Sequence, residues 1–326
     1  MYLLFTIISI MMVLSSESLF LCWLCLEIMT ISFIPFILWH NCNQYLKVSA
    51  WTYFVVQAVG SGMFLILSQM EDISMISFDS DFMSCFCMIL MFMCLFMKMG
   101  MPPFHQWLVN LSEGLNWYSY YVLNVLQKLG PILIIYKMSM GMNDSLVYLC
   151  MLVAISSMLG MFNYSIRSFL VFSSVINISW VIMGSTTDKI ACLMMLTNYS
   201  LLMMLIMIIL SHNRISEFSS IGYSFKGTLS SEFVFLLSVL SLAGVPPMGG
   251  FIFKFHIVLH CVYWGITFST LILLLTSVMF LMMYIYISQC IITKHKSPMV
   301  LNYYKPMNIC SLLFCSQFFM PVMYFF

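Results

Sequence analysis

Long apolar runs, separated by short polar or turn-rich breaks, follow one another along the whole chain. The runs are continuously apolar, and a helix needs about 20 apolar residues to cross a bilayer. The pattern therefore predicts an all-α polytopic membrane protein and not a barrel, in which apolar and polar residues alternate. Reading between the breaks predicts eleven transmembrane helices, at residues 1–16, 19–39, 48–69, 83–109, 117–136, 145–162, 169–187, 190–211, 229–258, 264–290 and 309–326.

Two of these predicted spans are interrupted in their middle. Span 4 contains Lys98-Met-Gly-Met-Pro-Pro-Phe-His-Gln-Trp107, and span 9 contains Leu242-Ala-Gly-Val-Pro-Pro-Met-Gly-Gly-Phe-Ile-Phe-Lys254. Paired prolines inside a span free backbone carbonyls and amides, which only a polar, protein-lined or watered cavity can satisfy. Two ordinary proline kinks are the alternative interpretation.

The spacing of the two breaks suggests an internal repeat. Spans 4 and 9 are five apart, which predicts one five-helix repeat over 1–137, a second over 145–290, and a separate C-terminal helix at 309–326. Because five is odd, the second repeat would be inverted in the membrane. Paired broken helices in inverted repeats point to an ion pathway. We expect the whole of 1–326 to form a single membrane domain.

Composition leads to the same class of protein. Hydrophobic residues make up 63% of the chain and charged residues only 7%, against about 25% charged in a soluble domain. So few charges exclude a soluble globular protein, and the high hydrophobicity excludes disorder. A net charge of +1 argues against a nucleic-acid partner, which needs a basic face. The expected environment is the lipid bilayer.

Two residue types bear on the cellular compartment. Met accounts for 34 of the 326 residues and mostly stands where Ile, Leu or Val would serve. This bias indicates a mitochondrial genome, in which an A/T-rich Ile codon is read as Met; drift among apolar residues is the alternative. The twelve cysteines show no pattern of a secreted disulfide scaffold. No basic residue or cleavage site marks a signal peptide, so the first run is interpreted as a retained span.

Basic residues are distributed unequally between the two sets of loops. The loops after spans 2, 4, 6, 8 and 10 hold seven, namely Lys47, Arg167, Arg214, Lys226, Lys294, Lys296 and Lys305, whereas the opposite loops hold Lys137 and Lys189. The positive-inside rule therefore places the N-terminus inside, which in a mitochondrion is the matrix. Eleven spans then place the C-terminus in the intermembrane space.

Five acidic or basic residues fall inside the predicted spans: Glu27, Lys98, Lys128, Glu232 and Lys254. A charge at mid-bilayer costs roughly 2.5–3.5 kcal/mol on insertion scales, so such residues face the bundle interior and are functional candidates. Glu232 lies in the first turn of span 9, where an acid suits the helix dipole. The other four could form a proton relay, or only a structural ion pair.

The Glu27 and Lys98 side chains are expected to pair. A lone carboxylate and a lone ammonium in apolar helices should approach each other, because leaving either unpaired is costly. We expect their heavy atoms within about 4–8 Å, directly or through one water. The looser end of that range is expected, since a pumping pair must be able to part. If the carboxylate moves away or is protonated, the lysine should release its proton.

Other polar residues give weaker signals. His105, beside the first break, is a possible member of the pathway. Cys22 and Cys25 match a C-x-x-C pattern but lie within an apolar span, which favours core packing. His256 and His260 stand at i and i+4 and share a helix face, which could bind a metal or a haem. Because no other paired histidine site appears in the sequence, a role in a polar path or at a helix end is favoured and no metal site is assigned. No nucleotide-binding motif is found.

Five segments resemble motifs of one family, the antiporter-like membrane subunits of respiratory NADH–ubiquinone oxidoreductase (complex I). Lys98 to Trp107 resembles the family's KxGxxPFHxW segment, and Leu126 to Pro131 resembles its QKxxP helix. Three more segments follow the motifs LRKxxAYSS, LSLxGxPPxxGFxxK and WxxLExNxxSF, namely Arg167–Ser174, Leu240–Lys254 and Trp23–Phe33. The motifs occur in family order, from residue 19 to about 255, and together they are highly specific.

The resemblance implies a role in proton translocation from the matrix to the intermembrane space, driven by electron transfer in other subunits. It implies two inverted five-helix repeats, and animal mitochondrial members have the eleven spans counted above. The family roles carry over to Glu27 and Lys98 as the input pair, Lys128 as the central relay and Lys254 as the residue leading to the exit.

The resemblance also implies partners and cofactors. No cofactor is expected in this chain; NADH, FMN, iron–sulfur clusters and ubiquinone are expected in partner subunits. The expected partners are other membrane-arm subunits, especially the antiporter-like and small membrane subunits. One departure from the family concerns Val109-Asn110, where Pro-Glu is usual. Glu113 is not an obvious replacement, so an accessory carboxylate is in doubt there.

Two other functions stay open on the sequence. A stand-alone cation/proton antiporter of the same superfamily would need a mid-membrane carboxylate in its second repeat, where the sequence offers Lys254 at depth. A structural membrane-arm subunit without a proton path would not need four deep charges. Both are therefore less favoured than a proton-pumping subunit of an electron-transfer complex.

Overall fold

The chain forms two compact units, Met1–Val153 and Ala154–Phe326. The computed structural model describes residues 1–40, 44–76, 81–139, 165–213, 229–246 and 248–294, with short pieces at 147, 150–151, 153–155, 157–158, 160, 215 and 217. The predicted span 309–326 and most of the predicted span 145–162 lie outside these residues, so the count of eleven is not tested.

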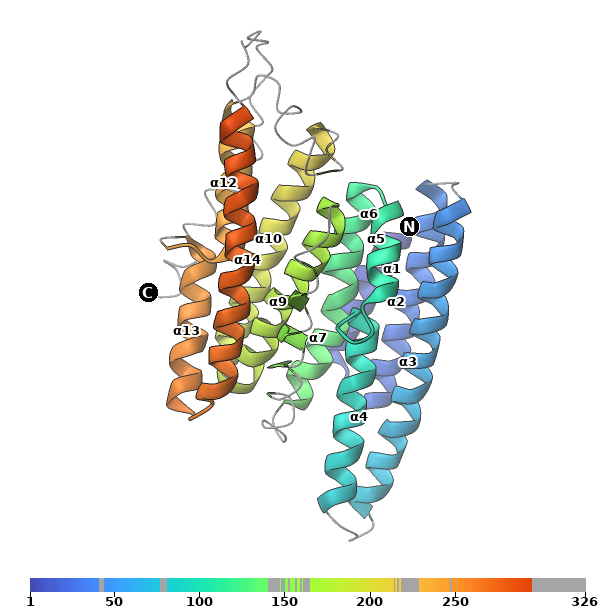
Figure 1. Cartoon of the computed structure of the whole chain (residues 1–326). Coiled ribbons are helices and arrows are strands. Elements are labelled where there is room, and N and C mark those ends of the chain that lie inside the picture. The colour runs from blue at the N-terminus through green and yellow to red at the C-terminus, as the bar shows by residue number, and fades with distance from the viewer. Residues whose placement is uncertain are drawn as a thin grey trace. The chain divides into compact units, whose positions relative to one another are not determined.

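The first unit is built from helices that follow the predicted spans closely (Figure 1). The helices are α1 (Tyr2–Ser15), α2 (Leu19–His40), α3 (Gln44–Ile76), α4 (Asp81–Met99), α5 (Gln106–Gly114), α6 (Trp117–Tyr121), the π-helix η1 (Val122–Leu126) and α7 (Gln127–Met138). Consecutive helices α1 to α4 pack against one another, and α7 packs against α1, α2 and α4. Helix α7 therefore closes the unit around the two helices that carry Glu27 and Lys98.

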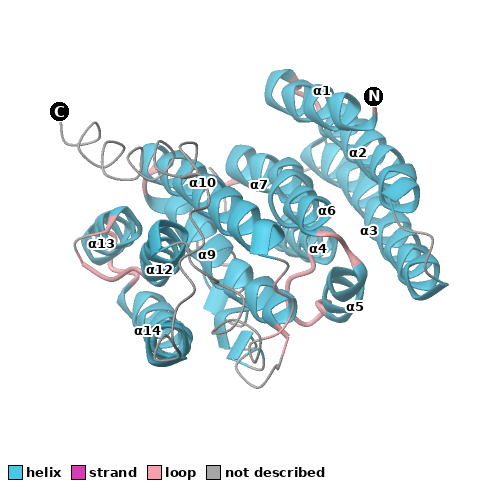
Figure 2. Cartoon of the chain, turned by 90° about the horizontal axis from the view of Figure 1, so that it is seen from above, coloured by secondary structure: helices cyan, strands magenta, loops and turns pink. Residues whose placement is uncertain are grey.

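The second unit has α9 (Ile166–Thr187), α10 (Lys189–Asn213), α12 (Leu229–Ala243), α13 (Gly249–Tyr263) and α14 (Thr267–Lys294). Helix α10 packs against α9, α12 and α13, and α14 packs against α9, α12 and α13. Seen along the helix axes, α12 lies between α10 and α14, beside α13 (Figure 2). Helix α9 is buried along nearly its whole length and packs against α10, α13 and α14.

The outward-facing side chains are apolar, as a bilayer requires. Large exposed hydrophobic residues occur in both units, for example Leu4, Trp51, Ile66, Phe268 and Leu275. Within the described residues, α2, α3, α9, α10 and α14 are long and apolar enough to cross a membrane, and α1, α4, α12 and α13 are shorter apolar helices. An apolar core covered by an apolar exterior is unstable in water, so the chain is a membrane protein.

The interruption predicted in span 4 separates α4 from α5. Gly100 has a φ of +67°, a left-handed conformation that L side chains rarely adopt. The Gly100 amide donates to the Met97 carbonyl at 3.1 Å, and the Met101 amide donates to the Phe96 carbonyl at 2.9 Å. This pair of bonds is the Schellman motif of a helix C-terminus.

The interruption predicted in span 9 ends α12 with the same motif. Gly244 has a φ of +87°. Its amide donates to the Ser241 carbonyl at 3.2 Å, and the Val245 amide donates to the Leu240 carbonyl at 3.2 Å. In both units, Gly followed by one residue and Pro-Pro thus ends a helix in mid-span.

Candidate functional site

Glu27 and Lys98 meet in the interior of the first unit. Glu27 is on α2 and Lys98 is in the last turn of α4. The Lys98 Nζ and Glu27 Oε1 atoms lie 3.9 Å apart, and the two side chains are 2% and 25% exposed. At this distance the charges attract each other without a direct hydrogen bond, and within the described residues the Nζ atom has no hydrogen-bond partner. The predicted proximity is confirmed, but the expected looser spacing is wrong, because the two charges approach to 3.9 Å in the low-dielectric interior.

Helix α3 supports the backbone beside Lys98. The Gln57 side-chain amide donates a 2.9 Å hydrogen bond to the Lys98 carbonyl. This carbonyl is among the last four of α4, which have no partner within their own helix. Gly60, one turn further along α3, adjoins Lys98, because a Cβ built there would be in ordinary contact with Lys98 Cγ at 3.5 Å. Gln57 therefore satisfies a group that the break exposes.

A second polar link crosses the same interior. The Tyr53 hydroxyl on α3 donates to Gln127 Oε1 on α7 at 3.4 Å, and Gln127 Nε2 donates to the Met29 carbonyl on α2 at 3.3 Å. Met29 is two residues from Glu27, and Gln127 directly precedes Lys128. The link thus joins the helix of the acid to the start of the helix that carries the next lysine.

Lys128 is surrounded by irregular helical backbone. It is 2% exposed and lies between the π-helix η1 and Pro131. Pi-helical turns are rare and are frequent at functional sites, and Pro131 cannot donate to the carbonyl of Gln127. The buried Asn124 Oδ1 in η1 also has no hydrogen-bond partner within the described residues. Lys128 is thus preceded along the chain by a π-helix with a polar residue and followed by a proline.

Lys254 is held by the break of the second unit. Its Nζ donates to the carbonyls of Leu242 and Ala243 at 3.0 and 3.3 Å. These are two of the last carbonyls of α12, freed where the helix ends at Gly244. Lys98 lies before its break and Lys254 lies after the other, so the two lysines reach their breaks from opposite sides.

Two small cavities adjoin Lys254, each with room for about one water molecule. Both are partly polar: Asn177 lines both, Ser173 and Tyr284 line one, and Asn198 lines the other. The buried Asn198 Oδ1 has no hydrogen-bond partner in the described part of the chain. Because buried polar atoms normally have partners, these cavities suit bound water next to the Lys254 ammonium.

The remaining predicted candidates lie nearby but carry weaker evidence. His105 directly precedes α5, beside the first break, and is half-buried. Asn110 and Glu113, both on α5, are exposed. The structure brings Glu27 and Lys98 together and places Lys128 in the same unit, while Lys254 belongs to the second unit.

Several polar side chains of these sites were not singled out from the sequence. Gln57, Tyr53 and Gln127 surround the first-unit charges, and Asn177 and Asn198 surround Lys254. The available signal was an amide side chain within an apolar run, which is as unusual in a membrane span as a charge. The carbonyl partners of Lys254 had no sequence signal, because every residue has a carbonyl.

The part of the chain that matches a known protein family contains all four charged residues. Residues 16–280 match the family described as NADH:quinone oxidoreductase/Mrp antiporter, a transmembrane family. The match includes Glu27, Lys98, Lys128 and Lys254 together with both breaks. The chain therefore belongs to this family of antiporter-like membrane proteins.

Comparisons with individual proteins show which members of the family the chain is similar to. The chain is 28% identical over 295 residues to the NADH-ubiquinone oxidoreductase chain 2 of Xenopus laevis, covering 88% of this chain and 84% of the relative. It is similar in fold to a chain of respiratory complex I from Thermus thermophilus, with a TM-score of 0.82, 16% identity and coverage of 99% and 76%. It is also similar to a chain of the Mrp complex from Dietzia sp. DQ12-45-1b, with a TM-score of 0.73, 16% identity and coverage of 94% and 61%.

Proposed function

We propose that the chain is an antiporter-like, proton-translocating core subunit in the membrane arm of mitochondrial NADH:ubiquinone oxidoreductase, of the kind named chain 2 in animals. The family match and the chain 2 relatives support this assignment. The observation that carries the mechanism is the pairing of Glu27 with the buried Lys98 beside a broken helix. The chain acts as part of an enzyme and contributes proton transfer to it.

The geometry suggests how a proton enters the path. In an ion pair at 3.9 Å, no direct hydrogen bond has to break when the two side chains separate. When Glu27 is protonated or moves away, the buried Lys98 ammonium loses the charge that stabilises it and releases its proton inward. Lys128 would receive the charge next, and Lys254, with its small polar cavities, would lead to the exit.

We further propose that the two units are inverted five-helix repeats within one membrane domain. Their common feature is a mid-span helix that ends in a Schellman motif at Gly100 or Gly244. The proposed orientation has the N-terminus in the matrix and the C-terminus in the intermembrane space, after eleven spans. Protons would then move from the matrix to the intermembrane space across the inner membrane.

In this proposal the redox chemistry belongs to partner subunits. NADH, FMN, iron–sulfur clusters and ubiquinone would bind there, and this chain would hold none of them. Its partners would be the other antiporter-like subunits and the small membrane subunits of the arm. The apolar exterior of both units suits contact with such helices as well as with lipid.

The antiporter alternative calls for a carboxylate near mid-membrane in the second unit. There, Lys254 is held by backbone carbonyls. Glu232 is buried in the first turn of α12, roughly 16 Å along the helix axis from its end at Ala243, at 1.5 Å per residue. This arrangement favours proton transfer by lysines over the binding of a metal cation at the break.

A Lys98→Ala variant of the intact complex tests the proposal. We expect NADH–quinone turnover and the protons moved per NADH to fall several-fold, while NADH oxidation by an artificial acceptor, which uses only the hydrophilic arm, persists. Lys47→Ala, which removes an exposed lysine on α3, should leave both activities unchanged. A Lys98→Ala complex that pumps at the original stoichiometry would contradict the proposed role.

A further inference from the structure

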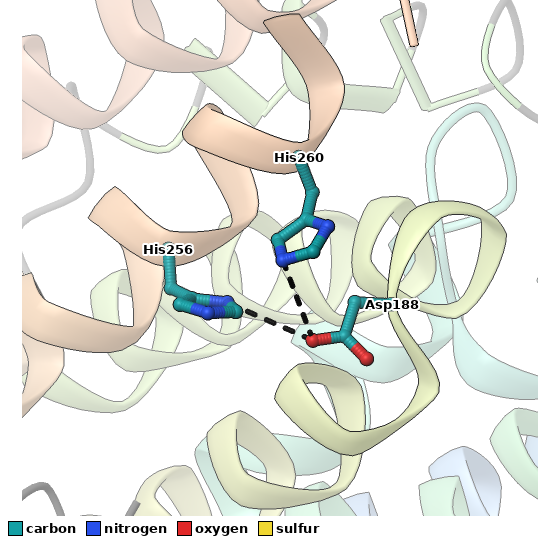
Figure 3. Close-up of side chains that lie close together, drawn as sticks. All are labelled: Asp188, His256 and His260. Atoms are coloured by element: carbon teal, nitrogen blue, oxygen red, sulfur yellow. Dashed lines mark ion pairs between the residues drawn. The ribbon is translucent and has the colours of Figure 1, made fainter. Parts of the chain in front are cut away.

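A cluster of three side chains with metal-binding chemistry lies in the second unit, apart from the charges described above. His256 Nδ1 and His260 Nε2 lie 3.7 and 3.8 Å from the same atom, Asp188 Oδ2. The three ligand atoms are all within 4.8 Å of one another. Figure 3 shows both imidazole rings, from α13, turned toward the carboxylate at the turn between α9 and α10.

The Asp188 carboxylate is oriented by its own backbone surroundings. Its Oδ1 accepts a 3.0 Å hydrogen bond from the Ile190 amide at the start of α10, which leaves Oδ2 directed at the two rings. The Asp188 amide donates to the Gly184 carbonyl at 2.8 Å, so the residue is fixed at both ends. The carboxylate therefore presents one oxygen to the histidines in a defined position.

The distances suit a shared cation better than direct hydrogen bonds. Both nitrogen–oxygen separations exceed hydrogen-bond length. Two atoms bound to Zn²⁺ at about 2.0–2.1 Å in tetrahedral geometry are roughly 3.4 Å apart, slightly less than the 3.7 and 3.8 Å found here. Each nitrogen–oxygen separation would have to shorten by only a few tenths of an ångström. The two histidine nitrogens lie within 4.8 Å of each other, and rotation of their side chains can bring them closer.

The types of ligand residue indicate which metal ion would bind. Two histidines at i and i+4 share one helix face and are a common zinc-binding arrangement. Imidazole nitrogen with one carboxylate oxygen suits Zn²⁺, whereas Mg²⁺ and Ca²⁺ prefer oxygen alone. Three protein ligands leave a fourth position for water. Access is open, because a groove beside His260 is lined by Thr187, Leu259, Tyr263 and Trp264.

We propose that Asp188, His256 and His260 form a Zn²⁺ site that clamps α13 to the turn between α9 and α10. His256 is two residues after Lys254, and residues two apart lie on different faces of a helix. Lys254 faces the end of α12, while the histidines face the α9–α10 turn. Bound Zn²⁺ would thus restrain α13, the half-helix that carries Lys254, on the face opposite to the one that Lys254 occupies.

The test is Zn²⁺ binding by the full chain, purified in lipid nanodiscs and measured by competition with a chromophoric chelator. We expect one saturable site of micromolar or tighter affinity. Asp188→Asn and His260→Gln should weaken it at least tenfold, and Mg²⁺ should not compete. His212→Gln is the matched control, because His212 is exposed in the last turn of α10 and its loss should change nothing.

Two further measurements do not depend on the folding of variants. Co²⁺ bound in place of Zn²⁺ should show visible d–d bands of nitrogen and oxygen ligation without a thiolate charge-transfer band. Zn²⁺ should slow hydrogen exchange in α13 and at the α9–α10 turn of the unaltered chain. Absence of saturable binding, a thiolate band that places the ion on cysteine, or unchanged exchange in α13 would each overturn the proposal.

Discussion

At the scale of single residues, the buried and half-buried lysines differ in the groups that stabilise their charge. Lys98 faces the Glu27 carboxylate, whereas Lys254 donates to two backbone carbonyls. Lys137, at the end of α7, donates to the Val13 and Ser16 carbonyls at the end of α1. A carbonyl carries a fixed partial charge, but a carboxylate can take up a proton. Of these three lysines, Lys98 is therefore the one whose partner can switch its charge.

This difference leads to a prediction for the Glu27–Lys98 pair. Glu27→Gln leaves the Lys98 charge buried without its partner, and breaking a buried pair costs about 3–5 kcal/mol. The lower end is expected, because the Glu27 side chain is 25% exposed. Adding Lys98→Met removes the stranded charge, so the double variant should be more stable than Glu27→Gln alone. Thermal unfolding of the purified chain measures both.

The double variant should regain stability but not proton pumping. Both the single and the double variant should lose coupled pumping, because each lacks the switching pair. Glu17→Gln is the control, since Glu17 is exposed between α1 and α2, and it should alter neither property. A double variant less stable than Glu27→Gln would show that the pair is not the source of the penalty.

At the scale of helices, the two breaks are built on glycines that cannot be replaced freely. Gly244 needs a φ of +87°, and a Cβ there would lie 3.2 Å from Lys254 Cδ and 3.4 Å from its Nζ. Gly265, in the turn after α13, has a similar φ of +77° but open space around it. Substituting Gly244 and Gly265 in turn therefore separates the effect of backbone strain from the effect of displacing Lys254.

Gly244→Ala and Gly265→Ala should therefore share one effect and differ in another. Each should destabilise the chain by about 1–2 kcal/mol, the cost of a left-handed conformation for an L residue. Only Gly244→Ala should also lower proton pumping, because the new methyl group displaces the Lys254 ammonium from the α12 carbonyls. Unfolding and pumping are measured on the same preparations. Equal pumping by the two variants would argue that the Lys254 position is not critical.

The helices and their breaks were largely predictable from the sequence. The span predicted at 169–187 is α9 at Ile166–Thr187, and that predicted at 190–211 is α10 at Lys189–Asn213. Both breaks were predicted from Pro-Pro, since proline cannot donate within a helix. These features depend on the residues of one segment, which is why a single sequence is sufficient to find them.

The side-chain partners were predictable only where charge forced them together. Glu27 and Lys98 could be paired in advance, because a lone buried charge needs an opposite one. Asp188 was not connected to His256, because 68 positions separate them in the sequence and a loop aspartate is ordinary. Gln57 was missed for a similar reason: its partner is a backbone carbonyl. Such contacts depend on how the helices pack, which apolar periodicity does not specify.

At the scale of the whole molecule, the remaining question is which side of the membrane each helix end faces. In the second unit, Asp188 at the start of α10 lies beside His256 and His260 near the end of α13. These two ends therefore share one side. Helix α10 continues to its last turn at His212, roughly 35 Å further at 1.5 Å per residue. This exceeds the bilayer core of about 30 Å, so His212 belongs to the opposite side.

The excess of basic residues in alternate loops predicts which side is which, and thiol labelling can test it. Tyr263 is 86% exposed at the end of α13, and the positive-inside rule assigns it to the intermembrane space. A membrane-impermeant maleimide should therefore label Tyr263→Cys in mitoplasts, and His212→Cys only in inside-out vesicles, above the background of the unaltered chain. The reverse pattern would invert the proposed direction of proton movement. Labelling of both positions from one side would contradict the assignment of α10 as a transmembrane helix.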